Sequence, residues 1–278
     1  MAEPLDQDLQ ALHAFIRRHP RLLVLTGAGV STASGIPDYR DLDGGWKRPP
    51  PMTLQQFMGT PLARARYWAR SMLGWPQMEL ARPNAAHQAL VGLQQRGQLQ
   101  LLVTQNVDGL HQKAGSTGVV DLHGALDRVC CMDCEQRLAR TELQQRLQQA
   151  NPDWQQLQAE TAPDGDVYLD GVDFAAFEVP PCSACGGVLK PDVVFFGESV
   201  PRVRVQQVQA ALEQADALLV LGSSLMVFSG YRFALRAHEL GLPVAAVNYG
   251  HNRAQDMLAL KIEADCGQLL QAVLATGG

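Results

Sequence analysis

Long hydrophobic runs and clusters of basic residues are both missing from this sequence of 278 residues. The longest uninterrupted apolar run lies near 217–221, far short of the roughly 18 residues that a membrane-spanning helix needs. The formal net charge is −5, and no stripe of lysine and arginine is present that would neutralise several phosphates. The first residues, MAEPLDQDLQ, are acidic and lack the basic leader and apolar segment of an export signal. We therefore expect a cytoplasmic protein without DNA, RNA or membrane partners.

What the sequence does contain is an alternation of buried strands and amphipathic helices. Hydrophobic residues make up 46% of the chain and charged residues 18%, which excludes a disordered protein. Four short apolar runs are typical of parallel strands covered on both faces. They are Leu22–Leu25, Leu101–Val103, Ala217–Leu221 and Val244–Val247. Helical patterns at 84–95 and 203–214 lie between them, so we expect an α/β fold with a Rossmann-like, doubly wound parallel sheet.

Small or polar residues follow each of these strands. The segments are Gly27–Gly29, Thr104–Asn106, Gly222–Ser224 and Asn248–Gly250. In open α/β sheets, ligands bind at the carboxyl ends of the strands. The four segments therefore predict one nucleotide-sized crevice at this edge of the sheet.

Gly27 and Gly29 form a G-x-G turn, which by itself is a weak sign of dinucleotide binding. The usual fingerprint has a third glycine three residues later, whereas the next glycine here is Gly35. Because residues 27–29 carry almost no side-chain bulk, we expect close approach to a pyrophosphate, with their N–H groups facing the anion. A plain tight turn is the alternative. Residues 36–51 are rich in glycine and proline and aperiodic, which predicts a mobile loop over the ligand.

Polar side chains near the second strand supply candidate catalytic groups. Asn106 and Asp108 are suited to hold ribose hydroxyls or a polar leaving group. His111 or His123 would provide a base near neutral pH. We favour His123, because it directly precedes a glycine and lies close to the first cysteine pair. A structural role is the alternative for any single histidine.

Six cysteines are present, and four of them form two C-x-x-C pairs, Cys131/Cys134 and Cys182/Cys185. Two such turns supply the four thiolates of a tetrahedral zinc site. Cys130 would give a C-x3-C spacing, so we assign Cys131 as the ligand. Four protein ligands leave no open position for substrate, which makes the zinc structural. The alternative is a C-x-x-C redox pair.

The two cysteine pairs are separated by 47 residues, 135–181, which is long for a zinc ribbon. Loop-closure entropy grows only logarithmically with length, so the site tolerates the insertion. Residues 151–181 hold seven acidic and no basic side chains. We interpret this acidic stretch as a solvated insertion, and a docking surface for basic protein segments is the alternative. The cysteine region, about 127–190, interrupts the strand–helix alternation and predicts a smaller inserted zinc-binding domain.

Taken in order, several motifs resemble those of the sirtuins, the NAD-dependent protein deacylases. The matching segments are GAGVSTASGIPDYR (27–40), TQNVDGLH (104–111), LHG (122–124), the two C-x-x-C pairs, KPDVVFFGE (190–198), GSS (222–224) and VN (247–248). Two further segments, RYWARSMLGWPQ (66–77) and PDGDVYL (163–169), resemble the class II branch. The resemblance implies an NAD-binding domain over 1–126 and 191–278, and a zinc-binding domain over 127–190 with helical contributions from about 41–80.

The resemblance also implies the chemistry. Sirtuins break the nicotinamide–ribose bond of NAD and transfer the acyl group of an acyl-lysine protein substrate to the ribose. NAD is then a consumed co-substrate, and one structural Zn²⁺ is the metal. His123 matches the general base that activates a ribose hydroxyl, while Asn106 and Asp108 match residues that position the nicotinamide ribose and the amide.

Further residues take binding roles from the same resemblance. Those expected at NAD are Gly27, Ala28, Gly29, Ser31, Ile36, Asp38, Tyr39, Arg40, Gln105, Asn106, Asp108, Gly222, Ser223, Ser224, Asn248, Tyr249, Gly250 and Cys266. Val193, Val194 and Phe196 resemble the strand and tunnel that hold the substrate backbone and the acyl-lysine stem. Tyr67 and Arg70 have the Y-x-x-R spacing of sirtuins that prefer acidic acyl groups, and ordinary helix packing is the alternative.

Three other functions would use parts of the same pattern. A protein mono-ADP-ribosyltransferase shares the cleavage of NAD and is the main alternative. A non-catalytic NAD-binding module is disfavoured because His123, Asn106 and Asp108 occur together. A dehydrogenase is disfavoured by the missing third glycine of the fingerprint.

Overall fold

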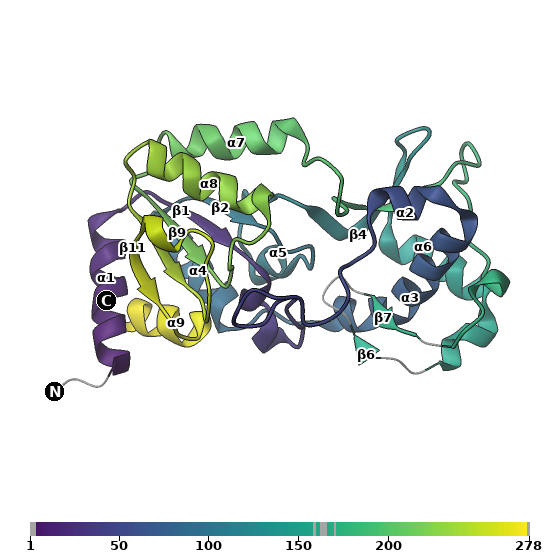
Figure 1. Cartoon of the computed structure of the whole chain (residues 1–278), viewed down its shortest axis with the longest axis horizontal. Helices are drawn as coiled ribbons and strands as arrows, with labels where there is room; N and C mark the ends of the chain where they lie inside the picture. The colour runs from purple at the N-terminus through teal and green to yellow at the C-terminus, as the bar shows by residue number, and fades with distance from the viewer. Residues whose placement is uncertain (1–3, 158–159, 162–165, 170, 277–278) are drawn as a thin grey trace.

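A six-stranded parallel sheet forms the larger part of the fold (Figure 1). The computed structural model describes residues 4–157, 160–161, 166–169 and 171–276. The strand order is β11 (Leu258–Ile262), β10 (Val244–Val247), β9 (Ala217–Leu221), β1 (Leu22–Thr26), β2 (Leu99–Thr104) and β3 (Val120–Asp121). From the central pair β1 and β9, later strands are added on both sides, so the sheet is doubly wound and the predicted fold class is confirmed.

Helices cover both faces of this sheet. On one face lie α1 (Pro4–Arg18), α4 (Ala85–Gln95) and α9 (Cys266–Thr276), and on the other lie α7 (Arg202–Leu212) and α8 (Phe228–Glu239). Successive strand residues point to opposite sides, so Leu22 and Val24 join the first buried cluster while Leu23 and Leu25 join the second. Each of these fully buried side chains stabilises the fold by roughly 1.5–3 kcal/mol. This two-sided burial is why the strands read as continuous apolar runs.

The loop after β1 is tied to the start of α4. Asn84 caps that helix, because its side-chain oxygen accepts a hydrogen bond from the Ala86 N–H at 2.9 Å. The amide group of Asn84 donates to the Val30 carbonyl at 2.8 Å and to the Ser34 hydroxyl at 2.9 Å. One polar side chain therefore fixes both the helix start, worth about 1 kcal/mol, and the position of the glycine loop.

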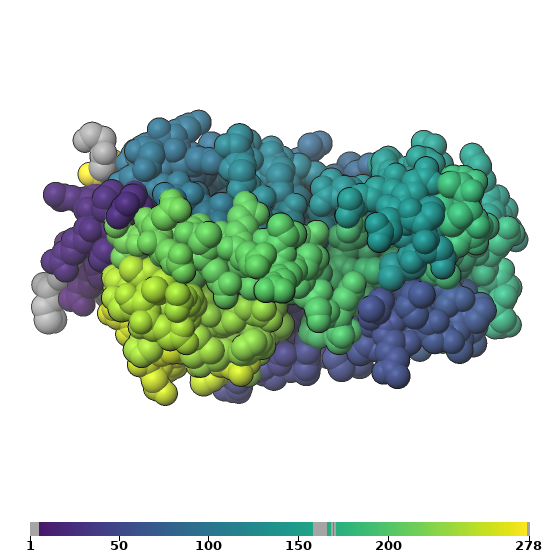
Figure 2. Space-filling view, turned by 90° about the horizontal axis from the view of Figure 1, so that it is seen from above, coloured from purple at the N-terminus to yellow at the C-terminus, as the bar shows by residue number. Residues whose placement is uncertain are grey.

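A smaller antiparallel sheet lies beside the large one. It consists of β5 (Arg137–Ala139), β4 (Gly124–Cys131) and β8 (Leu189–Val193), and the helices around it are α2 (Leu54–Gly59), α3 (Pro61–Leu80) and α6 (Arg140–Ala150). Phe57, Trp68, Val129 and Leu143 form part of one buried cluster between these elements. Figures 1 and 2 both show α2 and α3 at the same end of the molecule as the cysteine-bearing segment. Strands β4 and β8 cross the predicted domain boundaries at 126/127 and 190/191, and those boundaries stay a prediction.

The remaining elements are short. They are η1 (Ala28–Val30), η2 (Thr32–Ser34), α5 (Leu110–Ala114), η3 (Pro152–Gln156), β6 (Glu160–Thr161), β7 (Val167–Tyr168), η4 (Phe174–Ala176) and η5 (Gln255–Met257). Asp164 and Asp170 of the acidic stretch, and the first three residues of the PDGDVYL segment, lie outside the described residues. Among the helices that the structure describes, none combines the length and the apolar character needed to cross a membrane.

Candidate active site

A cavity of about 1370 Å³ lies along the carboxyl ends of the parallel strands. Gly27, Gln105, Gly222 and Asn248 line it, and they follow β1, β2, β9 and β10. The crevice predicted from the strand ends is therefore present, at the point where the strand order reverses between β1 and β9. Its volume exceeds the roughly 300–1,000 Å³ of a single small-ligand pocket, so it has room for more than one ligand.

Nearly all of the residues predicted for catalysis, NAD binding and substrate binding line this one cavity. They are Gly27, Ala28, Gly29, Ser31, Ile36, Asp38, Tyr39, Arg40, Tyr67, Arg70, Gln105, Asn106, Asp108, His123, Val193, Val194, Phe196, Gly222, Ser223, Ser224, Asn248, Tyr249 and Cys266. Gly250 is not part of the lining; a Cβ added there would lie 2.2 Å from the Leu42 carbonyl oxygen. Gly250 therefore permits close packing of the loop that borders the cavity.

The two glycines after β1 serve chain packing. The N–H groups of Gly27 and Gly29 donate to the carbonyls of Leu221 and Gly222 at 3.0 and 2.9 Å. The prediction that the N–H groups of residues 27–29 face an anion is therefore wrong for these two glycines, and it stays a prediction for Ala28. A Cβ at residue 27 would lie 2.7 Å from the Ser223 Cβ, and one at residue 29 would lie 3.0 Å from the Gly222 Cα. Small residues are required because the ends of β1 and β9 approach each other closely. The glycines thus permit the backbone after β1 to lie close to the backbone after β9.

Asn106, Ser31 and Asp108 form a hydrogen-bonded chain along the cavity wall. The Asn106 amide donates to the Gly27 carbonyl and to the Ser31 hydroxyl, both at 3.0 Å. Ser31 donates in turn to one Asp108 carboxylate oxygen at 2.7 Å, and the other oxygen accepts from the Leu110 N–H at 2.8 Å. The amide and the carboxylate are thus oriented by their neighbours before any ligand binds.

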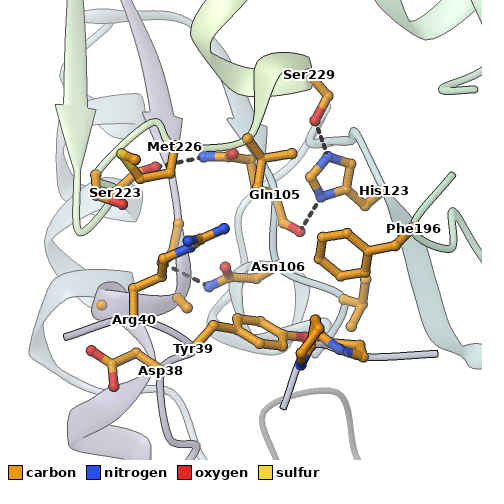
Figure 3. A pocket seen from close by; sticks show the side chains of 18 of the residues that line it. Asp38, Tyr39, Arg40, Gln105, Asn106, His123, Phe196, Ser223, Met226 and Ser229 are labelled. Carbon is orange, nitrogen blue, oxygen red and sulfur yellow. Dashed lines mark hydrogen bonds between the residues drawn. The ribbon is translucent and has the colours of Figure 1, made fainter. Parts of the chain in front are cut away.

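His123 lines the cavity, and its ring lies between Gln105 and Ser229, near Phe196 (Figure 3). Its Nδ1 lies 2.9 Å from the Gln105 carbonyl oxygen, and its Nε2 lies 2.7 Å from the Ser229 hydroxyl. A carbonyl only accepts, so Nδ1 carries the hydrogen, and the Nε2 lone pair accepts the Ser229 proton. Burial lowers the pKa of His123 to about 4, against the smaller opposing effect of the Gln105 carbonyl. The ring is therefore a neutral base at pH 7, as the sequence predicts, with a pKa well below that of a free imidazole.

His111, the other candidate base, lies outside the cavity lining. The ring is buried, its Nε2 lies 2.9 Å from the Thr26 hydroxyl, and its centroid is 4.8 Å from that of His87. Burial, and secondarily the nearby His87, lowers the pKa of His111 to about 3. Of the two histidines considered from the sequence, His123 is therefore the one placed to meet a ligand.

Acid conditions are expected to destabilise the protein through His111. Its pKa is about 3 in the fold and about 6.5 in the unfolded chain, so the stabilisation is complete above pH 6.5 and is lost as the pH falls toward 3. At pH 5 the loss due to His111 is roughly 2 kcal/mol, which lowers the Tm by about 4–8 °C, and His123, whose pKa is about 4, adds a similar loss in both proteins. The measurement is Tm between pH 8 and pH 5, for the natural chain and for His111→Asn. An identical pH slope in the variant would show that His111 is not the responsible group.

The loop 36–51 borders the cavity without regular helix or strand, which confirms its predicted irregularity. Arg40 donates to the Gly44 carbonyl at 2.8 Å, and its guanidinium carbon lies 3.7 Å from the Trp46 ring centroid. Trp46 also packs edge-on against Phe196, with ring centroids 5.6 Å apart. Asp38 forms an ion pair with Lys47. The loop therefore connects the glycine turn to the wall formed after β8, and its mobility stays a prediction.

The far end of the cavity contains both residues of the Y-x-x-R pattern. Tyr67 is buried against Phe57 and Phe195, each with ring centroids 5.3 Å away, as the packing alternative expects. Arg70 forms an ion pair with Asp166 at 3.0 Å. Asp166 lines the cavity and belongs to the acidic stretch, so the interpretation of that stretch as simply solvated is wrong at this residue.

The four cysteines of the C-x-x-C pairs converge at one point. Their sulfurs all lie within 4.8 Å of one another, with 3.6 Å between Cys131 and Cys185 and 3.8 Å between Cys134 and Cys182. A tetrahedral zinc with Zn–S bonds of about 2.3 Å requires sulfurs about 3.8 Å apart, so the residues fit one structural zinc. Cys130 is not part of the group. Antiparallel pairing of β4 with β8 places Cys131 opposite Leu189, which explains how the long insertion is bridged.

Ser229 and Asp166 are among the cavity residues that were not foreseen. Ser229, which contacts the imidazole, is a single serine at the start of α8 with no distinguishing pattern around it. Asp166 stands among many acids, so composition alone does not single it out. Ser229 and His123 are 106 residues apart in the sequence, so only the folded structure shows that they are in contact.

Doubly wound α/β proteins that bind nucleotides place the ligand across the strand switch point, and this cavity defines the chain as one of that class. The model of the Sir2 family matches residues 27–229. The chain therefore belongs to the Sir2 family, as the motifs predict, while the class II branch stays a prediction.

Relatives and solved structures agree over nearly the full length. An NAD-dependent protein deacetylase of Xanthomonas campestris pv. campestris is 62% identical over 270 residues, covering 97% of this chain and 92% of the relative. Another, from Bordetella bronchiseptica, is 62% identical over 268 residues, covering 96% and 98%. A solved structure described as a Sir2–p53 peptide–NAD+ complex has a TM-score of 0.75 at 28% identity, covering 97% of this chain and 98% of that chain.

Proposed function

We propose that this chain is an NAD-dependent protein lysine deacylase that cleaves nicotinamide from NAD and transfers the acyl group from lysine to ADP-ribose. The observation that carries the proposal is the position of the His123 imidazole, whose Nδ1 is held by the Gln105 carbonyl while its Nε2 lies inside the cavity. The names of the two bacterial relatives, and a solved Sir2 complex that holds both a peptide and NAD+, support it.

The chain's own residues divide the chemistry between them. When bound, NAD supplies the nicotinamide leaving group and the ribose that receives the acyl group. His123 Nε2 accepts a proton from a ribose hydroxyl, while the Gln105 carbonyl keeps the ring in the required tautomer. Such a positioned base contributes about 10²–10⁴ in rate. Asn106 and Asp108, oriented through Ser31, bind the nicotinamide ribose and the amide.

The other cavity residues predicted at NAD keep that role in the proposal. Burial raises the pKa of the Cys266 thiol to about 12, so it stays neutral and serves as a contact and not as a nucleophile. The Cys266 sulfur donates to the Val247 carbonyl at 3.4 Å, which places it at the end of β10. Gly250 acts indirectly, through the packing of the loop against it.

Acyl-lysine enters along the segment that follows β8. Val193, Val194 and Phe196 line this part of the cavity, and the Val194 N–H donates to the His123 carbonyl at 2.7 Å. Desolvating the ammonium of free lysine in such apolar surroundings is costly, whereas an amide needs only its hydrogen bonds satisfied. The wall therefore favours acylated over free lysine in protein substrates.

The alternatives are less well supported. Transfer of ADP-ribose to a protein side chain does not require the part of the cavity that continues past Phe196 to Tyr67 and Arg70. The bacterial relatives are also named deacetylases and not transferases of ADP-ribose. The four-cysteine geometry supports a structural metal and not a dithiol switch. A cytoplasmic location and the lack of nucleic-acid and membrane partners stay predictions from the sequence.

The products of one reaction test this function. The full-length protein is incubated with NAD and an acetyl-lysine peptide, and the mixture is analysed by mass spectrometry. We expect nicotinamide, free-lysine peptide and O-acetyl-ADP-ribose in equal amounts. ADP-ribose attached to protein, with the acetyl peptide unchanged, would contradict the proposal and establish the transferase alternative.

A further inference from the structure

The guanidinium of Arg70 is already held by the acidic insertion. Its Nη2 lies 3.0 Å from the Asp166 carboxylate, and its Nε donates to the Val167 carbonyl at 2.5 Å. The other Asp166 oxygen accepts from the Val167 N–H at 2.8 Å. Two adjacent residues of one strand end thus bind the fork of the guanidinium and fix its orientation.

Both members of this ion pair belong to the cavity wall and are poorly solvated. The Arg70 side chain is 17% exposed and the Asp166 side chain is 7% exposed. Both line the cavity together with Leu169 and Tyr67. Strand β7 packs against α3, which brings the insertion to the residue one helical turn after Tyr67. The insertion therefore contributes a charge to the cavity wall beside Tyr67.

We propose that Asp166 sets the class of acyl chain this protein removes: uncharged chains are accepted and chains ending in a carboxylate are rejected. The inference rests on the proposed deacylase function. An acyl carboxylate beside Arg70 would share one guanidinium with the Asp166 carboxylate, and two like charges at one poorly hydrated site repel strongly. The Y-x-x-R pattern alone would favour acidic chains, but here the arginine is neutralised from within the chain.

The test compares two peptides that differ only in charge. One carries succinyl-lysine and the other its neutral isostere, succinamoyl-lysine, in which the terminal carboxylate is an amide. The kcat/KM of the natural full-length protein is expected to be at least about tenfold lower for the succinyl peptide, and Asp166→Asn is expected to raise the succinyl-to-succinamoyl ratio about tenfold or more. Asparagine keeps the shape and the oxygen that holds the Val167 N–H.

A matched control is Asp153→Asn, which removes the same charge from an exposed position of the same insertion, outside the cavity lining. Its ratio is expected to equal that of the natural chain. The double variant D166N/R70Q is expected to lack the rise in the succinyl-to-succinamoyl ratio, because that rise requires the Arg70 guanidinium that D166N releases from its ion pair. If D166N does not fold, Arg70→Gln supplies the answer: the remaining Asp166 carboxylate should lower the ratio further.

The possible failures are distinct. Turnover of neither acetyl nor succinamoyl peptide by the natural chain would overturn the deacylase function itself. Turnover of the neutral peptides together with an unchanged ratio in folded D166N, or with a ratio that does not fall in Arg70→Gln, would overturn the role of Asp166 alone. A natural chain that prefers the succinyl peptide would do the same.

Discussion

Replacement of His123 by alanine is expected to abolish NAD-dependent deacylation, with kcat/KM falling by at least about 10²–10⁴. The imidazole is the neutral base whose Nδ1–H is fixed by Gln105 and whose Nε2 lies inside the cavity. His111, the other candidate histidine, cannot replace it, because His111 is buried outside the cavity lining. The measurement is the initial rate of nicotinamide release with an acetyl-lysine peptide, for the natural chain and the variant at equal protein concentration.

His238→Ala provides the matched control, because His238 is an exposed histidine in the last turn of α8, away from the cavity. Its rate should equal that of the natural chain. The His123 ring lines the cavity and does not belong to the four-cysteine group, so its alanine variant should keep the fold and the zinc content of the natural chain. Near-full activity of a folded His123→Ala protein would refute the assignment of the base.

Replacement of Cys182 by alanine is expected to release the zinc and to lower the Tm by about 5–10 °C. The Cys182 sulfur is one vertex of the tetrahedron, 3.8 Å from that of Cys134, and a three-thiolate site binds the ion less strongly. In a chain of this length each kcal/mol lost shifts the Tm by about 2–4 °C. Zinc per chain is measured by elemental analysis after gel filtration, beside a thermal unfolding curve.

Cys130→Ala is the control for this prediction, since Cys130 adjoins the first pair but lies outside the tetrad. It should retain one zinc per chain. Equal zinc in Cys182→Ala and the natural chain would contradict the structural metal site. Loss of zinc in both variants would show instead that Cys130 shares in binding.

The sheet was predictable because its strands are buried on both faces. Strands β9 and β10 begin and end at the predicted residues, while β1 and β2 extend beyond the predicted runs by one to three residues at their ends. The small sheet was not predicted, because β4 and β8 pair across more than fifty positions of sequence and carry charged residues among their apolar ones. Pairing at that separation leaves no local periodicity.

The cavity shows the same division between local and long-range information. Ligands bind at the carboxyl ends of parallel strands, and these ends lie at one edge of the sheet. This rule correctly placed Gly27, Asn106, Gly222 and Asn248 in one cavity. The purpose of the glycines was misjudged, since their N–H groups are consumed by chain packing. The sequence also could not show that burial lowers the pKa of His123, because that burial comes from neighbours remote in sequence.

The partners of Arg70 depend most on tertiary structure. The helical spacing of Tyr67 and Arg70 correctly indicated one wall of the cavity. Sequence spacing could not show that Tyr67 packs among aromatic rings, or that Asp166, from the insertion, neutralises the arginine. The insertion is thus part of the site and not only a spacer between cysteine pairs.

A structure of the protein with NAD and an acetyl-lysine peptide bound tests the central claim most directly. The account predicts that the sugar beside nicotinamide lies across the ends of β1 and β9, with one hydroxyl within about 3.2 Å of His123 Nε2 in place of the Ser229 hydroxyl. A dinucleotide bound away from this edge, or an imidazole that stays on Ser229 beyond reach of the sugar, would contradict it.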